Sequence, residues 1–167
     1  IVKAYIEDGN LDKAEEVLLR AEKQFPELNI DHQVTLLMIT IAVRRDGKSQ
    51  AIALLEKTLI SIRSDEIRMD LILRTAELYI DLKQYQKAII LLEKSPRKKD
   101  FPTQCYRMDR ALYTCYKSLD SLALAQNVLN RMIANRNYSN NMDEMLYYKG
   151  VLLYELGETD DAIKLFK

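Results

Sequence analysis

The chain has 167 residues, of which 48% are apolar, and its 25 basic and 25 acidic residues give a net charge of zero. This length and apolar content favour a folded core. A neutral chain lacks the bulk positive charge that nucleic acid or an anionic membrane attracts. Because four glycines and three prolines are all that interrupt residues of high helix propensity, the composition predicts an all-α fold.

Apolar residues recur at intervals of three and four along the whole chain, which predicts amphipathic helices. Breaks rich in glycine, proline or asparagine separate these stretches, among them the asparagine-rich 135–141. None of the apolar runs is long enough to span a bilayer. The predicted helices are 1–8, 11–24, 33–45, 48–63, 67–82, 85–95, 104–119, 121–135, 142–156 and 159–167.

Three columns of residues repeat along the chain at a constant step of 37. The first consists of five of the chain's 13 alanines, namely Ala14, Ala51, Ala88, Ala125 and Ala162. The second follows four residues later and comprises Leu18, Leu55, Leu92, Leu129 and Phe166. The third precedes the alanines by nine residues and comprises Tyr5, Ala42, Tyr79, Tyr116 and Leu153. Each repeat is therefore predicted to be a helix hairpin, in which the alanine lets two backbones approach closely.

We therefore predict a single repeat domain over 1–167. Its five repeats, called repeat 1 to repeat 5 below, span about 1–31, 32–68, 69–105, 106–142 and 143–167. The first and last repeats lack part of a helix, so we expect that both ends are truncated. Because stacked repeats need polar caps at their ends, uncapped end repeats predict self-association.

Three stretches resemble tetratricopeptide repeats: Ala4–Pro26, Ala76–Lys94 and Tyr147–Phe166. The matching positions are the alanine column, the small residues Ala76 and Gly150, the aromatic residues Tyr5, Tyr79 and Tyr116, and Pro26. The resemblance covers the whole chain and implies an α-solenoid, a right-handed superhelix of stacked antiparallel helix hairpins. The step of 37 exceeds the roughly 34 residues usual in the family. Larger residues take the small-residue place in the other repeats, so those hairpins are expected to cross less tightly; they are Val2, Ile39 and Tyr113.

The sequence carries no pattern typical of catalysis or of a metal site, so we predict a protein that is not an enzyme and needs no cofactor. Its one histidine, His32, has no partner at ligand spacing. The stretch 47–49 resembles the end of a phosphate-binding loop but lacks the loop's first glycine and its preceding strand. Cys105 and Cys115 lie on one predicted helix about 15 Å apart, too far for a disulfide, so both are expected to be reduced.

The resemblance implies that the first helices of the hairpins line a concave groove, where the family binds peptides. In repeat 4 a cationic row shares one helix face because its members are spaced by three and four residues. Arginine can hold a carboxylate through two hydrogen bonds, and tyrosine offers contact area and a hydroxyl donor. The predicted ligand-binding residues are Arg107, Arg110, Thr114 and Lys117 of this row, Arg74 and Glu77 of repeat 3, and Tyr147, Tyr148 and Tyr154 of repeat 5.

Two alternatives apply to this face. The acidic residues Asp70, Glu77 and Asp81 on the preceding first helix would neutralise Arg107 and Arg110 across the groove, since exposed charges are usually solvated or weakly paired. The tyrosine strip would pack against a further repeat. The basic stretch 96–99 is expected to be a solvated loop.

We predict a non-catalytic protein-interaction module or scaffold that binds a protein or peptide, acidic or C-terminal, in the concave groove. An alternative function is a sensor or regulatory segment of a larger bacterial signalling or transcription-regulating protein. The neutral charge argues against RNA, and we expect no membrane partner and a cytoplasmic location.

Overall fold

The computed structural model describes residues 1–25 and 31–166, except for the side chains of residues 22 and 31–33. Pro26 and the side chain of His32, both considered in the sequence analysis, lie outside the described residues. Every regular element in the described part of the chain is helical. In chain order the helices are α1 (Val2–Glu7), α2 (Leu11–Gln24), α3 (Asp31–Arg45), α4 (Lys48–Ser61), α5 (Asp65–Asp81), α6 (Tyr85–Lys94), α7 (Pro102–Ser118), α8 (Leu122–Ala134), the 3₁₀ helix η1 (Arg136–Asn141), α9 (Met142–Glu155) and α10 (Thr159–Leu165).

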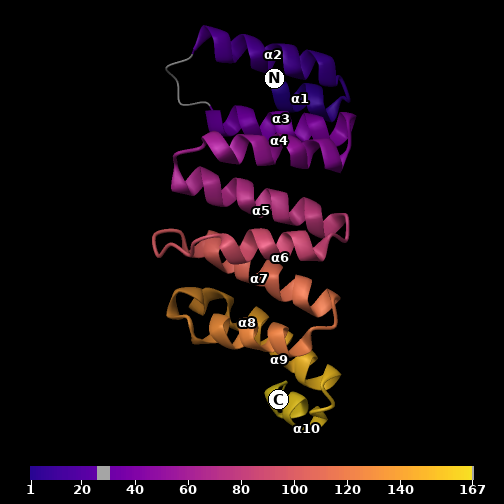
Figure 1. The fold of residues 1–167 in the computed structure, drawn as a ribbon, viewed down its shortest axis with the longest axis vertical. Coiled ribbons are helices and arrows are strands. Elements are labelled where there is room, and N and C mark those ends of the chain that lie inside the picture. Colours follow the sequence, from indigo (N-terminus) through magenta and orange to yellow (C-terminus); the bar gives the residue numbers. More distant parts are fainter. Residues whose placement is uncertain (26–30, 167) are drawn as a thin grey trace. The chain divides into compact units, whose positions relative to one another are not determined.

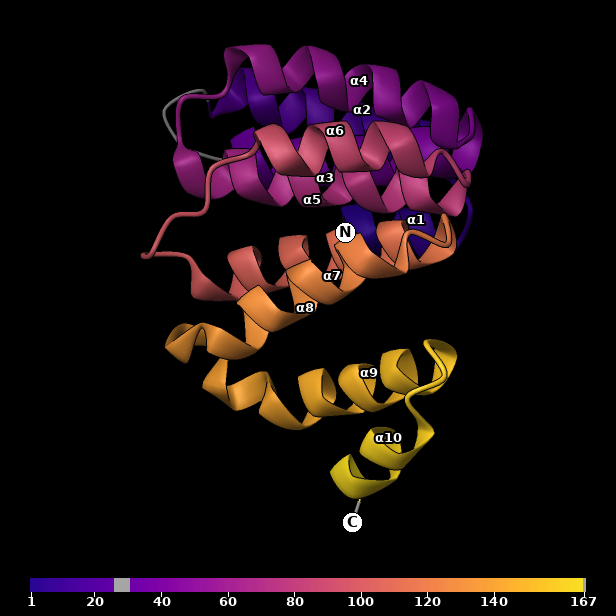
Figure 2. The ribbon, with the colours of Figure 1, turned by 60° about the horizontal axis from the view of Figure 1, so that its bottom comes forward.

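The chain divides into two compact units, Ile1–Arg68 and Met69–Lys167, which we call the N-terminal and C-terminal units; the boundary falls in the first turn of α5, most of which belongs to the C-terminal unit. In the N-terminal unit α1 packs on α2, α2 on α3 and α3 on α4 (Figure 1). In the C-terminal unit each helix from α6 to α10 packs on the next, and η1 contacts α7, α8 and α9 (Figure 2). The units meet in sequence where repeat 2 was predicted to give way to repeat 3. The single-domain organisation and its five repeat boundaries stay a prediction.

The predicted helix ends agree with the structure to within two residues, with one omission. Helix α7 begins two residues earlier than predicted, because Pro102 occupies the first helical position, where its missing N–H costs nothing. The stretch 135–141 was predicted as a break, but most of it forms η1. Its start is fixed by Asn135, whose side-chain oxygen accepts a hydrogen bond from the N–H of Asn137 at 3.1 Å.

The turns inside the hairpins share one backbone motif. In four of the described hairpins a residue with positive φ follows the first helix: Gly9, Lys83, Asp120 and Gly157. The N–H of the next residue then donates to the carbonyl of the residue in the Tyr5, Tyr79, Tyr116 and Leu153 column. This is the Schellman arrangement, which satisfies carbonyls that the helix end leaves unpaired. These four positive-φ residues are spaced by multiples of 37. In the remaining hairpin the equivalent position would be residue 46, but the positive φ falls one residue later, at Gly47.

Lys83→Gly is expected to stabilise the chain by about 0.5–1 kcal/mol, because a left-handed backbone conformation is strained in lysine but not in glycine. Lys83 has φ 57°. Urea unfolding followed by circular dichroism measures the difference. Lys149→Gly, inside α9, is the matched control and should cost about 1 kcal/mol. Equal destabilisation by both substitutions would contradict the prediction.

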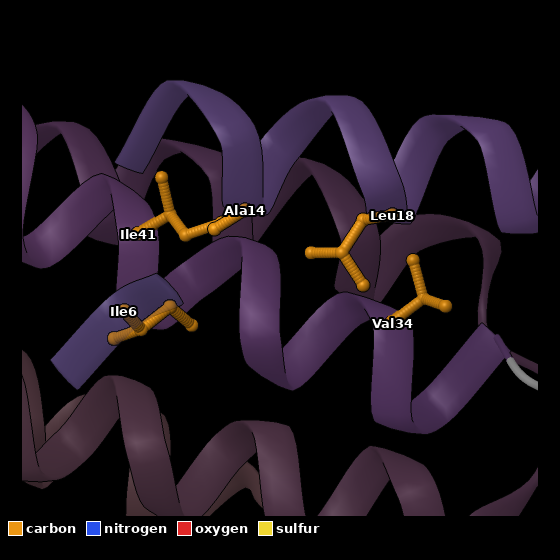
Figure 3. Close-up of a cluster of buried hydrophobic side chains, with 5 residues drawn as sticks. All are labelled: Ile6, Ala14, Leu18, Val34 and Ile41. Atoms are coloured by element: carbon orange, nitrogen blue, oxygen red, sulfur yellow. The ribbon is translucent and has the colours of Figure 1, made fainter. Parts of the chain in front are cut away.

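The alanine and leucine columns form the hairpin cores. All five alanines of the column are buried, and so are Leu18, Leu55, Leu92 and Leu129. In the N-terminal unit, Ala14 and Leu18 of α2 face Ile41 and Val34 of α3, with Ile6 of α1 beside them (Figure 3). Phe166 departs from its column because its side chain is 56% exposed.

Gly150 is the small residue whose role the structure makes visible. A Cβ atom there would lie 2.1 Å from the Phe166 ring, so the absence of a side chain lets the ring lie against α9. The described helices include none that is long and apolar enough to cross a membrane.

Candidate functional site

The predicted binding residues lie on three first helices of the C-terminal unit, α5, α7 and α9. We call this surface the first-helix face. On α7 the side chains of Arg107, Arg110 and Thr114 are exposed, and Lys117 is half-buried. The helical spacing therefore gave the correct exposed side of α7.

Arg107 forms an ion pair with Glu77 of the neighbouring first helix, α5. Its Nη2 lies 2.8 Å from Oε1 of Glu77 on α5. The other oxygen of Glu77 lies 3.6 Å from Nη1 of Arg74, so one carboxylate serves two arginines. All three side chains are about two-fifths exposed, and such exposed pairs contribute about 0–1 kcal/mol each. The sequence alternative of neutralisation by α5 is therefore confirmed for Arg107.

Arg110 pairs in the opposite direction, with Glu144 of α9 at 3.1 Å. The carboxylate of Glu144 also accepts hydrogen bonds from the hydroxyls of Tyr106 and Tyr148, both at 2.6 Å. Burial alone would raise the pKa of Glu144, but these three donors outweigh it and hold the pKa below its usual value. The cluster thus stabilises the fold above the ordinary pKa of a glutamate, and this contribution is lost as the pH falls through the lowered value.

The other two side chains of the α7 row, Lys117 and Thr114, also have partners within the protein. Lys117 Nζ lies 3.0 Å from Oε1 of Glu155 on α9. The hydroxyl of Thr114 donates to the carbonyl of Arg110 in its own helix at 3.0 Å. Thr114 therefore has no hydroxyl donor to offer a ligand while this bond is kept.

The predicted tyrosine strip divides into one structural and two accessible side chains. Tyr148 stacks on Tyr113 of α7, with ring centroids 5.2 Å apart and an interplanar angle of 26°. Burial is the main reason that the pKa of Tyr113 rises to about 12. Tyr147 and Tyr154 are 59% and 67% exposed, and they lie on one side of α9 because seven residues make about two turns.

A buried carboxylate behind this face was not predicted from the sequence. Asp109 on α7 is 3% exposed and lies 2.8 Å from Arg97 Nε and 3.3 Å from Arg131 Nη2. Its second oxygen accepts a hydrogen bond from the Tyr138 hydroxyl at 3.0 Å. We call these four residues the Asp109 cluster. It joins α7 to α8, η1 and the loop after α6.

The expectation that the stretch 96–99 is solvated was wrong for Arg97. Besides Asp109, its guanidinium donates to the backbone carbonyls of Leu92 and Ser95, at 3.0 and 2.8 Å. A sequence signal for this cluster exists: Asp109 falls in the buried stripe formed by Tyr106, Met108 and Leu112 on the same helix. A carboxylate in such a stripe requires a partner.

Both cysteines are unpaired and buried, as expected from their spacing. Burial raises the pKa of Cys115 to about 11, so its thiol stays protonated at neutral pH. The described residues contain no group of three or more histidine, cysteine, aspartate or glutamate side chains that could hold a metal ion.

Comparison with known proteins supports the architecture. A family model described as a tetratricopeptide repeat matches residues 144–167. A crystal structure of nearly identical TPR-like repeats, from a Podosopora anserina protein assigned as a kinesin light chain, aligns with 99% of this chain and 88% of its own, at a TM-score of 0.61 and 16% identity. The chain is built on the tetratricopeptide-repeat fold. A single-substitution variant of the same fungal repeats aligns equally, with a TM-score of 0.60, 16% identity, and coverage of 99% and 87%. None of the curated proteins matches the chain.

Tetratricopeptide repeats are in general modules for protein interaction, typically without catalytic activity. The fold prediction, an all-α stack of antiparallel helix hairpins of the tetratricopeptide type, is confirmed. The fungal structures are too distant in sequence to assign binding residues, so the first-helix face must be judged from its own geometry.

Proposed function

We propose that this tetratricopeptide module binds an acidic segment of a partner protein on the first-helix face of the C-terminal unit, with Arg107 as the principal cation. The observation that carries the proposal is the shared pairing of Glu77. Because Glu77 contacts both Arg107 and Arg74, a ligand carboxylate can take over Arg107 while Glu77 remains paired with Arg74.

Exchange of this kind costs little because the pairs are exposed. A ligand carboxylate replaces one half-exposed ion pair by another, and an arginine fork can bind it bidentately. Arg110 is the poorer candidate, since its release would remove one of the three donors that hold Glu144. The geometry therefore separates two arginines that the sequence treated alike.

The two exposed tyrosines of α9 supply the apolar part of the proposed contact. Tyr147 and Tyr154 both present large exposed rings. The contacts described for Tyr147 are with the rings of Tyr148 and Phe166. Tyrosine is enriched among residues that dominate binding energy at protein interfaces. The ligand class is thus an acidic segment that also carries an apolar or aromatic residue.

The test measures binding of fluorescein-labelled short acidic peptides that contain phenylalanine, by fluorescence anisotropy. Arg107→Gln should weaken binding about fivefold, the upper end for an exposed charge pair. Glu77→Gln should strengthen it, because the substitution removes the internal competitor for Arg107. Arg20→Gln and Glu16→Gln, which each neutralise one member of an exposed ion pair of α2 outside the first-helix face, are the matched controls and should leave the affinity unchanged.

A general charge effect at low salt would also give opposite responses in the Arg107 and Glu77 variants, but it would give them equally at the exposed Arg20–Glu16 pair of α2. Responses confined to Arg107 and Glu77 therefore distinguish this proposal from a general charge effect. Parallel loss of binding in the Arg107 and Glu77 variants, or equally large responses in the two α2 variants, would refute it. The alternative function as a sensor segment of a larger bacterial regulator stays a prediction, which no described residue favours.

A further inference from the structure

A cleft lies on the other side of the C-terminal unit, between the second helices of successive hairpins. It has a volume of about 430 Å³, is open to solvent, and is lined by the end of α6 with its following loop, by α7 and by α8. We call it the α6–α8 cleft. Its floor is apolar, formed by Leu112 and the Tyr116 ring from α7 and by Val128 from α8.

A second cleft lies one hairpin further along, at equivalent positions of the repeat. That cleft, of about 480 Å³, is lined by α8, by α9 and by α10 with the residue before it. Several lining residues of the two clefts are 37 positions apart, such as Tyr116 and Leu153, or Val128 and Leu165. In the second cleft two lining residues form an ion pair with each other, since Lys164 Nζ lies 2.8 Å from Oδ1 of Asp161.

The mouth of the α6–α8 cleft differs from the same place in other hairpins. In two hairpins a lysine from the second helix lies over the column tyrosine: Lys13 over Tyr5 at 6.0 Å, and Lys87 over Tyr79 at 5.6 Å. At the corresponding position the cleft has Leu124, which is 47% exposed. A half-exposed leucine beside an apolar floor is typical of a site that receives an apolar group.

The cleft carries one arginine that is accessible to an anion. Two arginines and one glutamate line it, and the hydroxyl of Tyr116 donates to that glutamate, Glu93. The buried carboxylate of Asp109 neutralises Arg97, which it contacts more closely than Arg131. Arg131 is 60% exposed and so keeps donors for an incoming carboxylate.

We propose that the α6–α8 cleft binds the apolar C-terminal residue of a partner protein. The side chain lies on the floor against Tyr116 and Val128, and the α-carboxylate pairs with Arg131. Val128 and Arg131 are three residues apart on α8, about 4.5 Å along the axis, which suits a side chain and a carboxylate carried by the same residue. This surface is separate from the first-helix face and does not depend on it.

The test uses N-acetyl-phenylalanine as probe, titrated into the ¹⁵N-labelled chain and followed by amide chemical shifts. The acid should bind with a dissociation constant on the order of 1 mM, as expected for so small a ligand. The shifts should centre on α8 at Leu124, Val128 and Arg131. N-acetyl-phenylalaninamide, which lacks the carboxylate, should bind about fivefold more weakly.

Two variants locate the site, and a third separates it from the first-helix face. Arg131→Gln should abolish the preference for the acid over the amide. Leu124→Asp should weaken both probes; it introduces the residue found one repeat later at Asp161, and an acidic residue in the first turn of a helix is well tolerated. Arg107→Gln should change neither titration, and circular dichroism should show all three variants folded.

The proposal is overturned if acid and amide bind alike, or if the shifts follow Arg107→Gln rather than Arg131→Gln. It is also overturned if N-acetyl-Phe-Glu-amide, whose carboxylate is on a side chain, binds as well as N-acetyl-phenylalanine. None of these outcomes bears on binding of acidic peptides by the first-helix face, which has its own variants.

Discussion

Asp109→Ala is expected to lower the free energy of unfolding by about 3–5 kcal/mol, the range found when one partner of a buried ion pair is removed. The substitution removes the counter-charge of the Arg97 guanidinium, which keeps only its bonds to backbone carbonyls, and leaves the hydroxyl of Tyr138 without its acceptor. Tyr138 is 2% exposed, so water does not readily replace the lost partner. Urea unfolding followed by circular dichroism and by tyrosine fluorescence measures the loss.

Two further variants separate charge from hydrogen bonding. Asp109→Asn keeps the side-chain shape and one acceptor oxygen, so its free energy of unfolding should lie between those of the wild type and of Asp109→Ala. Asp143→Ala removes an exposed aspartate from the first turn of α9 and should cost less than about 1 kcal/mol. If Asp109→Ala were no more costly than Asp143→Ala, the cluster would contribute nothing to the fold.

The repetition made most of the fold predictable. Residues 37 apart face the same physical constraints, so one recognisable hairpin informs the others. Ala14, Ala88 and Ala125 are each completely buried, because a larger side chain would separate the two helices of a hairpin. The hairpin turns were located even where no glycine marks them, as at Lys83 and Asp120, since the flanking apolar period stops there.

The pairing of charges was less predictable, for a geometric reason. Helical spacing tells which residues share a face, but not which neighbouring helix their side chains reach. The sequence offered α5 as the source of counter-charges for both arginines, and the structure pairs Arg107 with Glu77 of that helix. Arg110 reaches Glu144 on α9 instead, a residue whose two tyrosine donors come from different helices. Such a cluster depends on how neighbouring hairpins pack, which one repeat alone does not contain.

Arg97 illustrates the same limit in a loop. Three basic residues in a short stretch are usually solvated, and nothing local distinguishes the first from the others. Its role follows from Asp109, twelve residues away on α7. A rule that searches for carboxylates within a buried helical stripe, and then for a nearby arginine, would have found both residues.

Leu129→Ala and Phe166→Ala test how far equivalence within a column extends, and they are expected to differ by several kcal/mol. Leu129 of α8 is 1% exposed, so its truncation should cost about 3–4 kcal/mol through lost burial and the cavity left behind. Phe166 occupies the same column but is 56% exposed, so its truncation should cost less than about 1 kcal/mol despite its larger ring.

The same urea titrations measure both variants, and the leucine of the preceding repeat provides the control. Leu92 is completely buried, so Leu92→Ala should resemble Leu129→Ala rather than Phe166→Ala. A similar cost for all three would mean that sequence position in the repeat, not burial, determines the contribution of a residue. A large cost confined to the two leucines means that a column predicts stability only where the neighbouring helix covers it, which no pattern within a single repeat can reveal.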